Sequence, residues 1–380
     1  MRVKLFGKIQ SKKCMKNLFG STYKGKRVLI TGHTGFKGSW LTLWLTKLGA
    51  EVIGYSKDVP TNPNHFGLLK LKIISIKGDI LDKKKLFRVI KRYKPDIIFH
   101  LAAQALVGYS YINPVETFET NIMGSINIFE ACRKLGKRIS IVNITSDKCY
   151  QNNEKKEGYK EDDPLGGDDP YSASKGAVEI VSNSYRKSFF PVNKFDIEHH
   201  ILLSNARAGN VIGGGDWGEY RLIPDIVKAT HQNKKTLIRN PQSIRPWQHV
   251  LEPLSGYLQI GQKLLQSKKE YADNWNFGPN NKSSMTVNGV VKQAKIYWNK
   301  INYEILENKS SFHETNMLKL DSKKARKKLE WKSVWDSKTT IEKTINWYKK
   351  YYDEKIILSE KDLEEYINDA KKLSVNWTKL

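Results

Sequence analysis

Cysteine is rare in this chain. The 380 residues contain only Cys14, Cys132 and Cys149, and their spacings match neither a disulfide framework nor a zinc site. We therefore predict no metal centre and favour a reducing, cytoplasmic compartment.

Long apolar runs are also missing. The nearest approach, residues 97–107, is interrupted by His100 and Gln104 and is too short to span a membrane. The first residues are basic but have no apolar core and no small-residue cleavage site, so a signal peptide is not expected. Residues 1–14 are interpreted as a disordered or misannotated extension before a second possible start at Met15. We predict no membrane association.

Acidic residues are too few to balance the basic ones. The chain has 65 Lys and Arg against 39 Asp and Glu, a formal net charge of +26. Such an excess is compatible with a nucleic-acid surface. However, the lysines are spread along the whole chain, which is more typical of a lysine-rich surface than of a binding patch. We predict no nucleic-acid partner, and attraction of an anionic small substrate fits either interpretation.

Glycine, in contrast, is concentrated in one informative stretch. An apolar run at Val28 is followed by three glycines spaced G-x-x-G-x-x-G and by a segment with helical apolar spacing. A strand, a glycine turn and a helix N-terminus together bind the pyrophosphate of a dinucleotide. The alternative is an ordinary tight turn. The predicted cofactor-binding residues of this turn are Gly32, Thr34, Gly35, Phe36, Lys37 and Gly38.

Strands and helices alternate after this turn. Strands are expected at 51–55, 73–76, 96–101 and 140–144, and helices at 83–93 and 116–135. This alternation predicts an α/β fold, a Rossmann-type doubly wound parallel sheet. Asp79 is expected either to accept from an adenine amino group or to cap the helix at 83–93. Lys57 leaves the choice between NAD and a 2′-phosphorylated cofactor ambiguous.

The chemistry centres on Tyr171 and Lys175, four residues apart at a helix start and so on one face. A nearby ammonium favours the phenolate and is expected to lower the tyrosine pKa. Ser146, at the end of the strand at 140–144, can share the hydrogen bond of a substrate hydroxyl. Together these residues predict proton abstraction coupled to hydride transfer.

Several longer motifs carry a family resemblance. They are GHTGFKGSWL (32–41), HLAAQALV (100–107), TSDKCY (145–150), GGDDPYSASK (166–175), ARAGNVIGGGDW (206–217), RLIPD (221–225) and RPWQHVLEPL (245–254). On these motifs the chain resembles the extended short-chain dehydrogenase/reductase superfamily, and within it the CDP-glucose 4,6-dehydratase family. The resemblance runs from about residue 24 to residue 351.

The resemblance implies internal redox chemistry on bound NAD. Tyr171, with Ser146 and Lys175, would remove the proton of the 4-hydroxyl of CDP-glucose while C4 gives up hydride. Asp147 and Lys148 would then act as acid and base in the loss of water, and hydride would return to C6. The better-known dTDP-glucose enzymes have Asp-Glu at this pair, so a surface charge or a phosphate contact stays open for Lys148.

The resemblance also assigns binding residues. Further cofactor contacts are expected from Asp79, Ile80, Leu101, Ala102, Ala103 and Asn121, beside Tyr171 and Lys175. The expected substrate-binding residues are Gln104, Asn210, Arg207, Trp217, Arg221, Arg245 and His249. Trp217 has a core position as its alternative, and His249 a structural one.

Four segments are expected. They are a basic extension (1–23), an NAD-binding Rossmann domain (24–206 plus 241–272), a smaller α/β nucleotide-sugar-binding domain (207–240 plus 273–352) and a charged C-terminal extension (353–380). The resemblance also implies a homodimer or homotetramer, because this superfamily packs its subunits through the apolar faces of the helices expected at 116–135 and 174–188. Three alternatives for function stay open: another nucleotide-sugar dehydratase or epimerase, a non-catalytic NAD-binding protein, and a nucleic-acid-binding protein.

Overall fold

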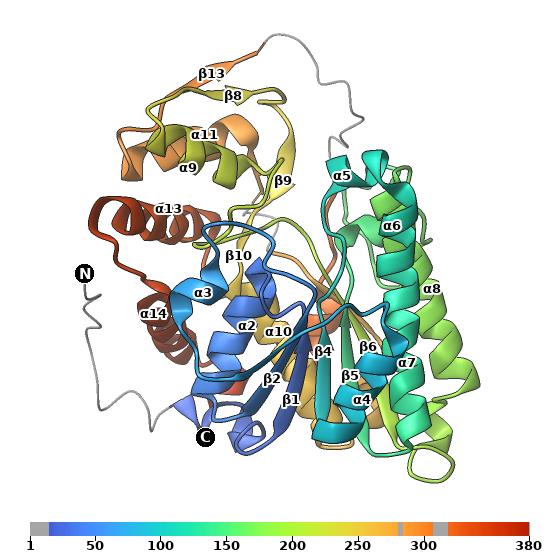
Figure 1. Ribbon diagram of the computed structural model, residues 1–380. Coiled ribbons are helices and arrows are strands. Elements are labelled where there is room, and N and C mark those ends of the chain that lie inside the picture. Colours follow the sequence, from blue (N-terminus) through green and yellow to red (C-terminus); the bar gives the residue numbers. More distant parts are fainter. Residues whose placement is uncertain (1–14, 280–283, 307–317, 380) are drawn as a thin grey trace.

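The first lobe of the protein is built around one seven-stranded sheet. The computed structural model describes residues 15–279, 284–306 and 318–379 (Figure 1). All strands of the sheet are parallel, and their order is β11 (Asn274–Phe277), β6 (Ile201–Ala208), β5 (Ile139–Ile144), β4 (Ile97–His100), β1 (Arg27–Thr31), β2 (Glu51–Ser56) and β3 (Ile74–Lys77). The order reverses between β1 and β4, which is where ligands bind in sheets of this kind. The predicted doubly wound Rossmann-type sheet is confirmed.

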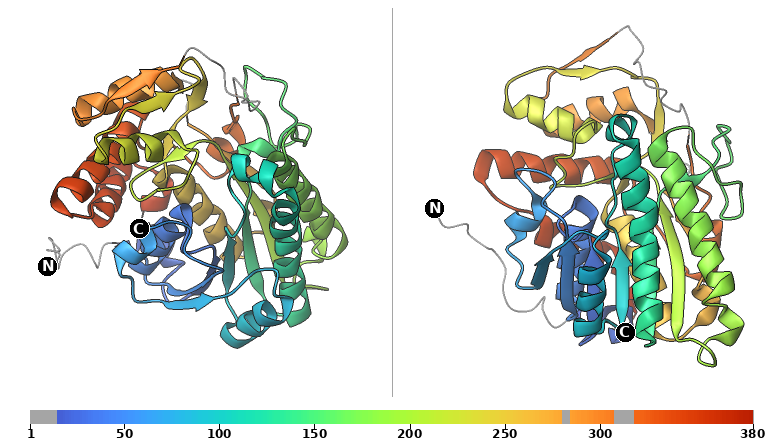
Figure 2. Two further views of the ribbon diagram at one scale, coloured as in Figure 1. Left: turned by 45° about the horizontal axis from the view of Figure 1, so that its top comes forward. Right: turned by 45° about the vertical axis from the view of Figure 1, so that its right-hand side comes forward.

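Helices cover both faces of this sheet. One face carries α2 (Phe36–Lys47), α10 (Leu251–Leu265), α12 (Lys323–Lys328) and α14 (Ser359–Lys372). The other carries α4 (Lys83–Tyr93), α7 (Gly124–Leu135) and α8 (Pro170–Ser188), with α7 and α8 side by side (Figure 2). Both faces are apolar because a parallel sheet is buried on both sides. The remaining helices of this lobe are α3 (His65–Leu69), α5 (Val107–Ile112) and α6 (Pro114–Phe118).

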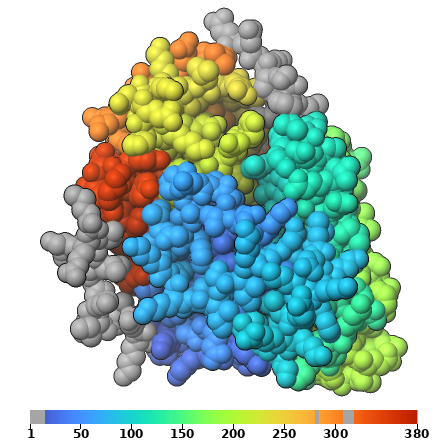
Figure 3. Space-filling view, viewed as in Figure 1, coloured from blue at the N-terminus to red at the C-terminus, as the bar shows by residue number. Residues whose placement is uncertain are grey.

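The second lobe is smaller and is built from residues 211–249, 284–306 and 337–354. Its elements are β7 (Val211–Ile212), α9 (Leu222–His231), β8 (Thr236–Ile238), β9 (Ile244–Pro246), β10 (Gln248–His249), β12 (Ser284–Thr286), α11 (Val287–Tyr297), β13 (Tyr303–Ile305) and α13 (Ser337–Glu354). The strands pair only two by two, and the helices enclose a separate apolar core. In the space-filling view this lobe, yellow and orange, rests on the blue segments of the first lobe (Figure 3).

Short helical turns complete the fold. They are Leu18–Ser21, the π-helical turn Glu119–Met123, Asp147–Cys149, Val192–Lys194, Lys269–Tyr271 and Asn376–Thr378. The π-helical turn interrupts the single helix that was predicted at 116–135. Its Asn121 side chain points inward and donates to the hydroxyl of Ser174 at 2.8 Å. A wider turn at this point therefore directs a polar side chain into the protein, as π-turns often do near functional sites.

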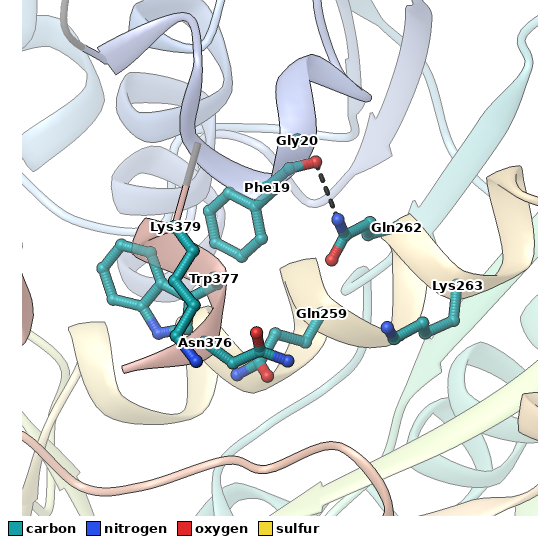
Figure 4. Close-up of a pocket in the computed structure, with 8 residues that line it drawn as sticks. All are labelled: Phe19, Gly20, Gln259, Gln262, Lys263, Asn376, Trp377 and Lys379. Carbon is teal, nitrogen blue, oxygen red and sulfur yellow. Dashed lines mark hydrogen bonds between the residues drawn. The ribbon is translucent and has the colours of Figure 1, made fainter. Parts of the chain in front are cut away.

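The predicted segment boundaries differ from the observed packing in two places. Strand β11, expected in the nucleotide-sugar domain, forms an edge of the central sheet beside β6. The two expected extensions are packed into the first lobe, where the rings of Phe19 and Trp377 stack with centroids 5.1 Å apart (Figure 4). Both segments carry buried apolar side chains, which their basic or charged composition concealed. Residues 1–14 lie outside the described residues.

Candidate active site

The glycine turn joins the end of β1 to the start of α2 and is folded tightly. A Cβ at Gly32, where φ is +74°, would lie 2.7 Å from the backbone nitrogen of Ala102, and one at Gly38 would lie 2.1 Å from the Gly32 carbonyl oxygen. Helix α2 begins after Gly35 with no side-chain cap. Its first N–H groups therefore face the turn without a side-chain acceptor, an arrangement that fits a pyrophosphate.

The ends of β2 and β3 lead to the residues predicted to lie on the adenosine side of the cofactor. The Asp79 carboxylate accepts from the backbone N–H of Leu81 at 2.9 Å and lies 3.4 Å from the Lys57 ammonium. Asp82, and not Asp79, caps α4 by accepting from Lys85. The capping alternative for Asp79 was therefore wrong, because the helix begins one turn later than that role requires.

At the end of β4 the predicted cofactor residues behave differently from one another. Leu101, Ala102 and Ala103 are half-buried beside the glycine turn. The Ile80 side chain is instead buried in the core, and Asn121 bonds to Gln104 and Ser174. The Gln104 amide is bonded to Leu106 and Thr117. These contacts fix the side chains of Ile80, Asn121 and Gln104 at this edge of the sheet. Cofactor contact for Ile80 and Asn121 and substrate contact for Gln104 stay predictions.

Tyr171 and Lys175 come together with Ser146 at the end of β5. The Lys175 ammonium lies 5.9 Å from the centroid of the Tyr171 ring. Burial raises the pKa of the Tyr171 hydroxyl to about 12, while a hydrogen bond with Ser146 acts to lower it. Burial lowers the pKa of the Lys175 ammonium to about 8. The tyrosine pKa thus moves opposite to the expected direction, since removal from water outweighs its charged neighbours.

Asp147 and Lys148 follow directly in a short helical turn. The buried Asp147 carboxylate accepts from the Ser146 hydroxyl at 3.0 Å. Burial raises its pKa, although Lys148 and Lys37 pull in the other direction. A carboxyl group that holds its proton more readily is suited to donate it. Lys148 is half-buried and lines a cavity of about 40 Å³ with Tyr111 and Asp168.

Three predicted substrate residues lie around this cluster. Arg221 donates to the Asp216 carboxylate at 2.9 Å, and its charge acts to lower the pKa of Tyr171. Arg245 acts in the same direction on Asp147. Next to the half-buried Asn210, a Cβ at Gly209 would lie 3.1 Å from an Asp147 carboxylate oxygen. The motifs after residue 206 therefore come back to the end of the central sheet.

Three further predicted substrate residues have interior side chains. Arg207 is fully buried and its guanidinium is bonded to Glu179. Trp217 is 2% exposed, packs on Trp347 and donates its indole N–H to Tyr352. His249 is fully buried against Trp40 and Trp335. We correct the assignment of Arg207, Trp217 and His249 as substrate ligands, because their side chains are enclosed by protein.

Sequence reasoning missed two acidic residues of this region. Asp216 orients Arg221 and acts on the Lys37 ammonium, whose pKa burial lowers to about 8. Glu179 is 1% exposed and lies on α8 one turn beyond Lys175. Asp216 lies within the GGGDW motif, and the helical spacing from Tyr171 could have indicated Glu179.

Residues 15–279, 284–306 and 318–379 contain neither a membrane-spanning helix nor a metal-binding cluster. No helix there is long and apolar enough to cross a membrane. The same residues contain no group of three or more His, Cys, Asp or Glu that could hold a metal ion.

The family of this chain follows from its match to a known family model. Residues 29–346 match the family model described as GDP-mannose 4,6 dehydratase. The chain belongs to this family. The predicted membership in the nucleotide-sugar dehydratases is therefore confirmed.

Relatives of this dehydratase family agree along nearly the whole chain. The CDP-glucose 4,6-dehydratase of Salmonella typhimurium is 45% identical over 350 residues, which are 91% of this chain and 97% of that protein. The dTDP-glucose 4,6-dehydratase from Bacillus anthracis in complex with NAD has a TM-score of 0.70 at 22% identity, covering 87% and 98% of the two chains. DesIV, a dTDP-glucose 4,6-dehydratase from Streptomyces venezuelae, has a TM-score of 0.72 at 19% identity, covering 85% and 97%. The last two show the shared fold.

Proposed function

We propose that this protein converts CDP-glucose to CDP-4-keto-6-deoxyglucose and water. One observation carries the proposal: Ser146, Asp147, Tyr171 and Lys175 converge at the ligand-binding edge of the sheet in a chain 45% identical to a CDP-glucose 4,6-dehydratase. The product would supply deoxysugar synthesis for surface polysaccharide. The cytoplasm is the proposed compartment, since Cys132 and Cys149 are free thiols.

The proposed cofactor is NAD. The glycine turn and the uncapped start of α2 would hold its pyrophosphate, and Asp79 would lie on the adenosine side. When bound, the cofactor would supply a hydride acceptor for C4 and, once reduced, a hydride donor for C6. The preference for NAD over a 2′-phosphorylated cofactor comes from the family resemblance, since the Asp79 carboxylate and the Lys57 ammonium lie 3.4 Å apart and their charges offset each other.

The residues of this chain would move the protons. Tyr171 takes the proton of the 4-hydroxyl, with Ser146 sharing the hydrogen bond and acting to lower the tyrosine pKa, and with the Lys175 ammonium 5.9 Å from the centroid of the Tyr171 ring. Asp147, with its raised pKa, donates a proton to the departing 6-hydroxyl. Lys148 takes the proton on C5. We propose that Asn210, Arg221 and Arg245 bind the sugar phosphates, because arginine suits paired phosphate oxygens.

The test is incubation with CDP-, dTDP-, UDP- and GDP-glucose and mass measurement of each product. We expect loss of one water from CDP-glucose, and deuterium placed at C4 should reappear at C6. A product that keeps its 6-hydroxyl, or a label that washes into solvent, contradicts the proposal. Tyr171→Phe should bind substrate but turn over roughly 10²–10⁴-fold more slowly.

We further propose that the chain forms a homodimer through α5, α6, the Glu119–Met123 turn and α8. Large apolar side chains are exposed along this side of the protein: Ile112 at 70%, Val115 at 69% and Ile180 at 60%, with Phe118 and Met123 beside them. Exposed apolar side chains grouped in this way are typical of an interface. Light scattering should give a dimer for the parent and a monomer for the variant with Val115→Glu and Ile180→Glu.

A further inference from the structure

The catalytic turn, residues 145–150, is held at both ends by one buried ion pair. At its start, the Thr145 hydroxyl donates to the Glu179 carboxylate at 2.5 Å. At its end, the Arg207 guanidinium donates to the Tyr150 hydroxyl at 2.5 Å. Between these two contacts lie Ser146, Asp147 and Lys148.

The hydrogen bonds of the ion pair fix the positions of both side chains. Glu179 accepts from Arg207 through both oxygens, at 2.9 Å each, and also from Asn205 at 2.7 Å. With Thr145 this makes four donors, which is the full capacity of a carboxylate. The Arg207 guanidinium donates in addition to the Glu161 carbonyl oxygen. A two-pronged pair with every acceptor used fixes direction as well as distance.

The same carboxylate belongs to the helix that carries the catalytic tyrosine. Glu179 lies on α8 one turn after Lys175 and two turns after Tyr171, so the three share a face. The turn also packs directly on this helix, since a Cβ at Gly176 would lie 3.2 Å from the Cys149 carbonyl oxygen. Glu179 thus connects the two catalytic elements.

We infer that the Glu179–Arg207 pair is a positioning device that fixes the turn bearing Ser146, Asp147 and Lys148 against the helix bearing Tyr171 and Lys175. Both partners are enclosed by protein, so neither touches substrate. A buried ion pair is seldom more stable than apolar side chains of the same volume. Here the pair fixes the position of the turn relative to the helix. The inference rests on the proposed dehydratase reaction.

The two ends of the turn should affect different steps. Thr145 precedes Ser146, which shares the proton handled by Tyr171. Tyr150 follows the part of the turn that carries Lys148, the proposed base for loss of water. Release of the Thr145 end should therefore slow oxidation at C4. Release of the Tyr150 end should slow elimination, and reduced nicotinamide should build up.

The experiment uses Thr145→Val and Tyr150→Phe, which remove one hydroxyl each and leave the ion pair intact. The Tyr150 hydroxyl also donates to Asn276 at 2.8 Å, a contact that Tyr150→Phe removes together with the one to Arg207. We expect kcat to fall roughly tenfold to hundredfold with KM nearly unchanged, because a small displacement of reacting groups is costly. Nicotinamide absorbance after mixing with CDP-glucose should rise in Tyr150→Phe only. Matched controls are Thr344→Val, whose buried hydroxyl bonds only to the Thr340 carbonyl oxygen, and Tyr185→Phe, whose hydroxyl bonds to Glu130 on α7.

The outcomes separate this inference from the proposed function. If both variants turn over like the parent, or if their losses match those of the controls at equal loss of melting temperature, the positioning role is wrong. The same conclusion follows if neither variant changes the nicotinamide signal. If instead the parent forms no dehydrated product from CDP-glucose, the proposed function fails.

Discussion

Two buried glutamates on helices that cover opposite faces of the central sheet have opposite properties. Glu179 on α8 and Glu252 on α10 are each 1% exposed. Burial is the largest single influence on the pKa of Glu179 and acts to raise it, but the Arg207 guanidinium, the Thr145 hydroxyl and the Arg186 charge together lower that pKa. Among the described residues Glu252 has no such cationic partner, and burial raises its pKa to about 7. Equal burial therefore gives an ion in one place and a group that titrates near neutrality in the other.

The difference in pKa follows from the hydrogen-bond donors around each carboxyl group. Glu252 accepts from the backbone N–H groups of Val334 and Trp335 and from the Tyr366 hydroxyl, at 2.8–3.1 Å. These donors join α10 to the 334–335 segment and to α14, and none of them carries charge. Neutral donors stabilise the anion less than a guanidinium does. The carboxylate near the end of β5 thus carries a fixed charge, and the contact of α10 with residues 334–335 and α14 contains a carboxyl group whose charge changes with pH.

The largest expected effect comes from Glu179→Gln. The variant keeps the shape but leaves the Arg207 charge without its counter-ion, which should lower the free energy of unfolding at pH 7 by roughly 3–5 kcal/mol. Glu252→Gln removes no partner of a buried cation, and because burial disfavours the charged form of Glu252, it should not lower the free energy of unfolding at pH 7. Urea denaturation of both variants beside the parent measures the contrast. Equal losses would show that burial, and not the charged partner, controls the two sites.

The sequence predicted the parts of this comparison whose signal is local. The glycine turn, the strands of the first half and the joining of Tyr171, Lys175 and Ser146 follow from spacing along a few elements. Glu179 was missed because a glutamate on a helix usually faces solvent, and only the fold brings Arg207 to it. Arg207 was assigned to substrate for the complementary reason, since an arginine in a long motif resembles a ligand until its partner is known.

The second lobe and the two ends of the chain were harder to predict. Strand β11 pairs with β6, nearly seventy residues earlier, and nothing in its four residues indicates that partner. Phe19 and Trp377 meet across almost the full length of the chain. Contacts between such distant segments leave no periodic pattern in the sequence. The π-helical turn could not be predicted either, because Asn121 bonds to Gln104 and Ser174, which only the fold brings close to it. The substrate residues that lie near Asp147 came from the motifs of the family.

A second prediction concerns the pH dependence of the unfolding free energy, where the expected effect is somewhat smaller. Glu252 has its folded pKa raised from 4.5 to about 7, so it contributes stability that is complete below pH 4.5 and is lost as pH rises through 7. This loss should amount to about 2–3 kcal/mol. Glu252→Gln should remove that part of the decline, which the difference between the two unfolding curves at pH 5 and pH 8 isolates. Parallel curves would contradict the raised pKa.

The smallest effect is expected from Tyr366→Phe, which deletes one neutral donor from Glu252. The Tyr366 hydroxyl donates to a Glu252 carboxylate oxygen at 3.0 Å, and this hydrogen bond acts to lower the pKa of Glu252. Without it we expect a loss of about 1 kcal/mol in unfolding free energy. We also expect a higher pKa for Glu252, so the pH-dependent decline should begin at a higher pH than in the parent. Tyr271→Phe is the matched control, because its hydroxyl bonds to the Lys328 carbonyl oxygen and not to Glu252. Side-chain carbon NMR of Glu252 across pH 5–9 measures the shift directly, and a midpoint that stays in place would show that the two backbone N–H groups alone set the charge of this carboxyl group.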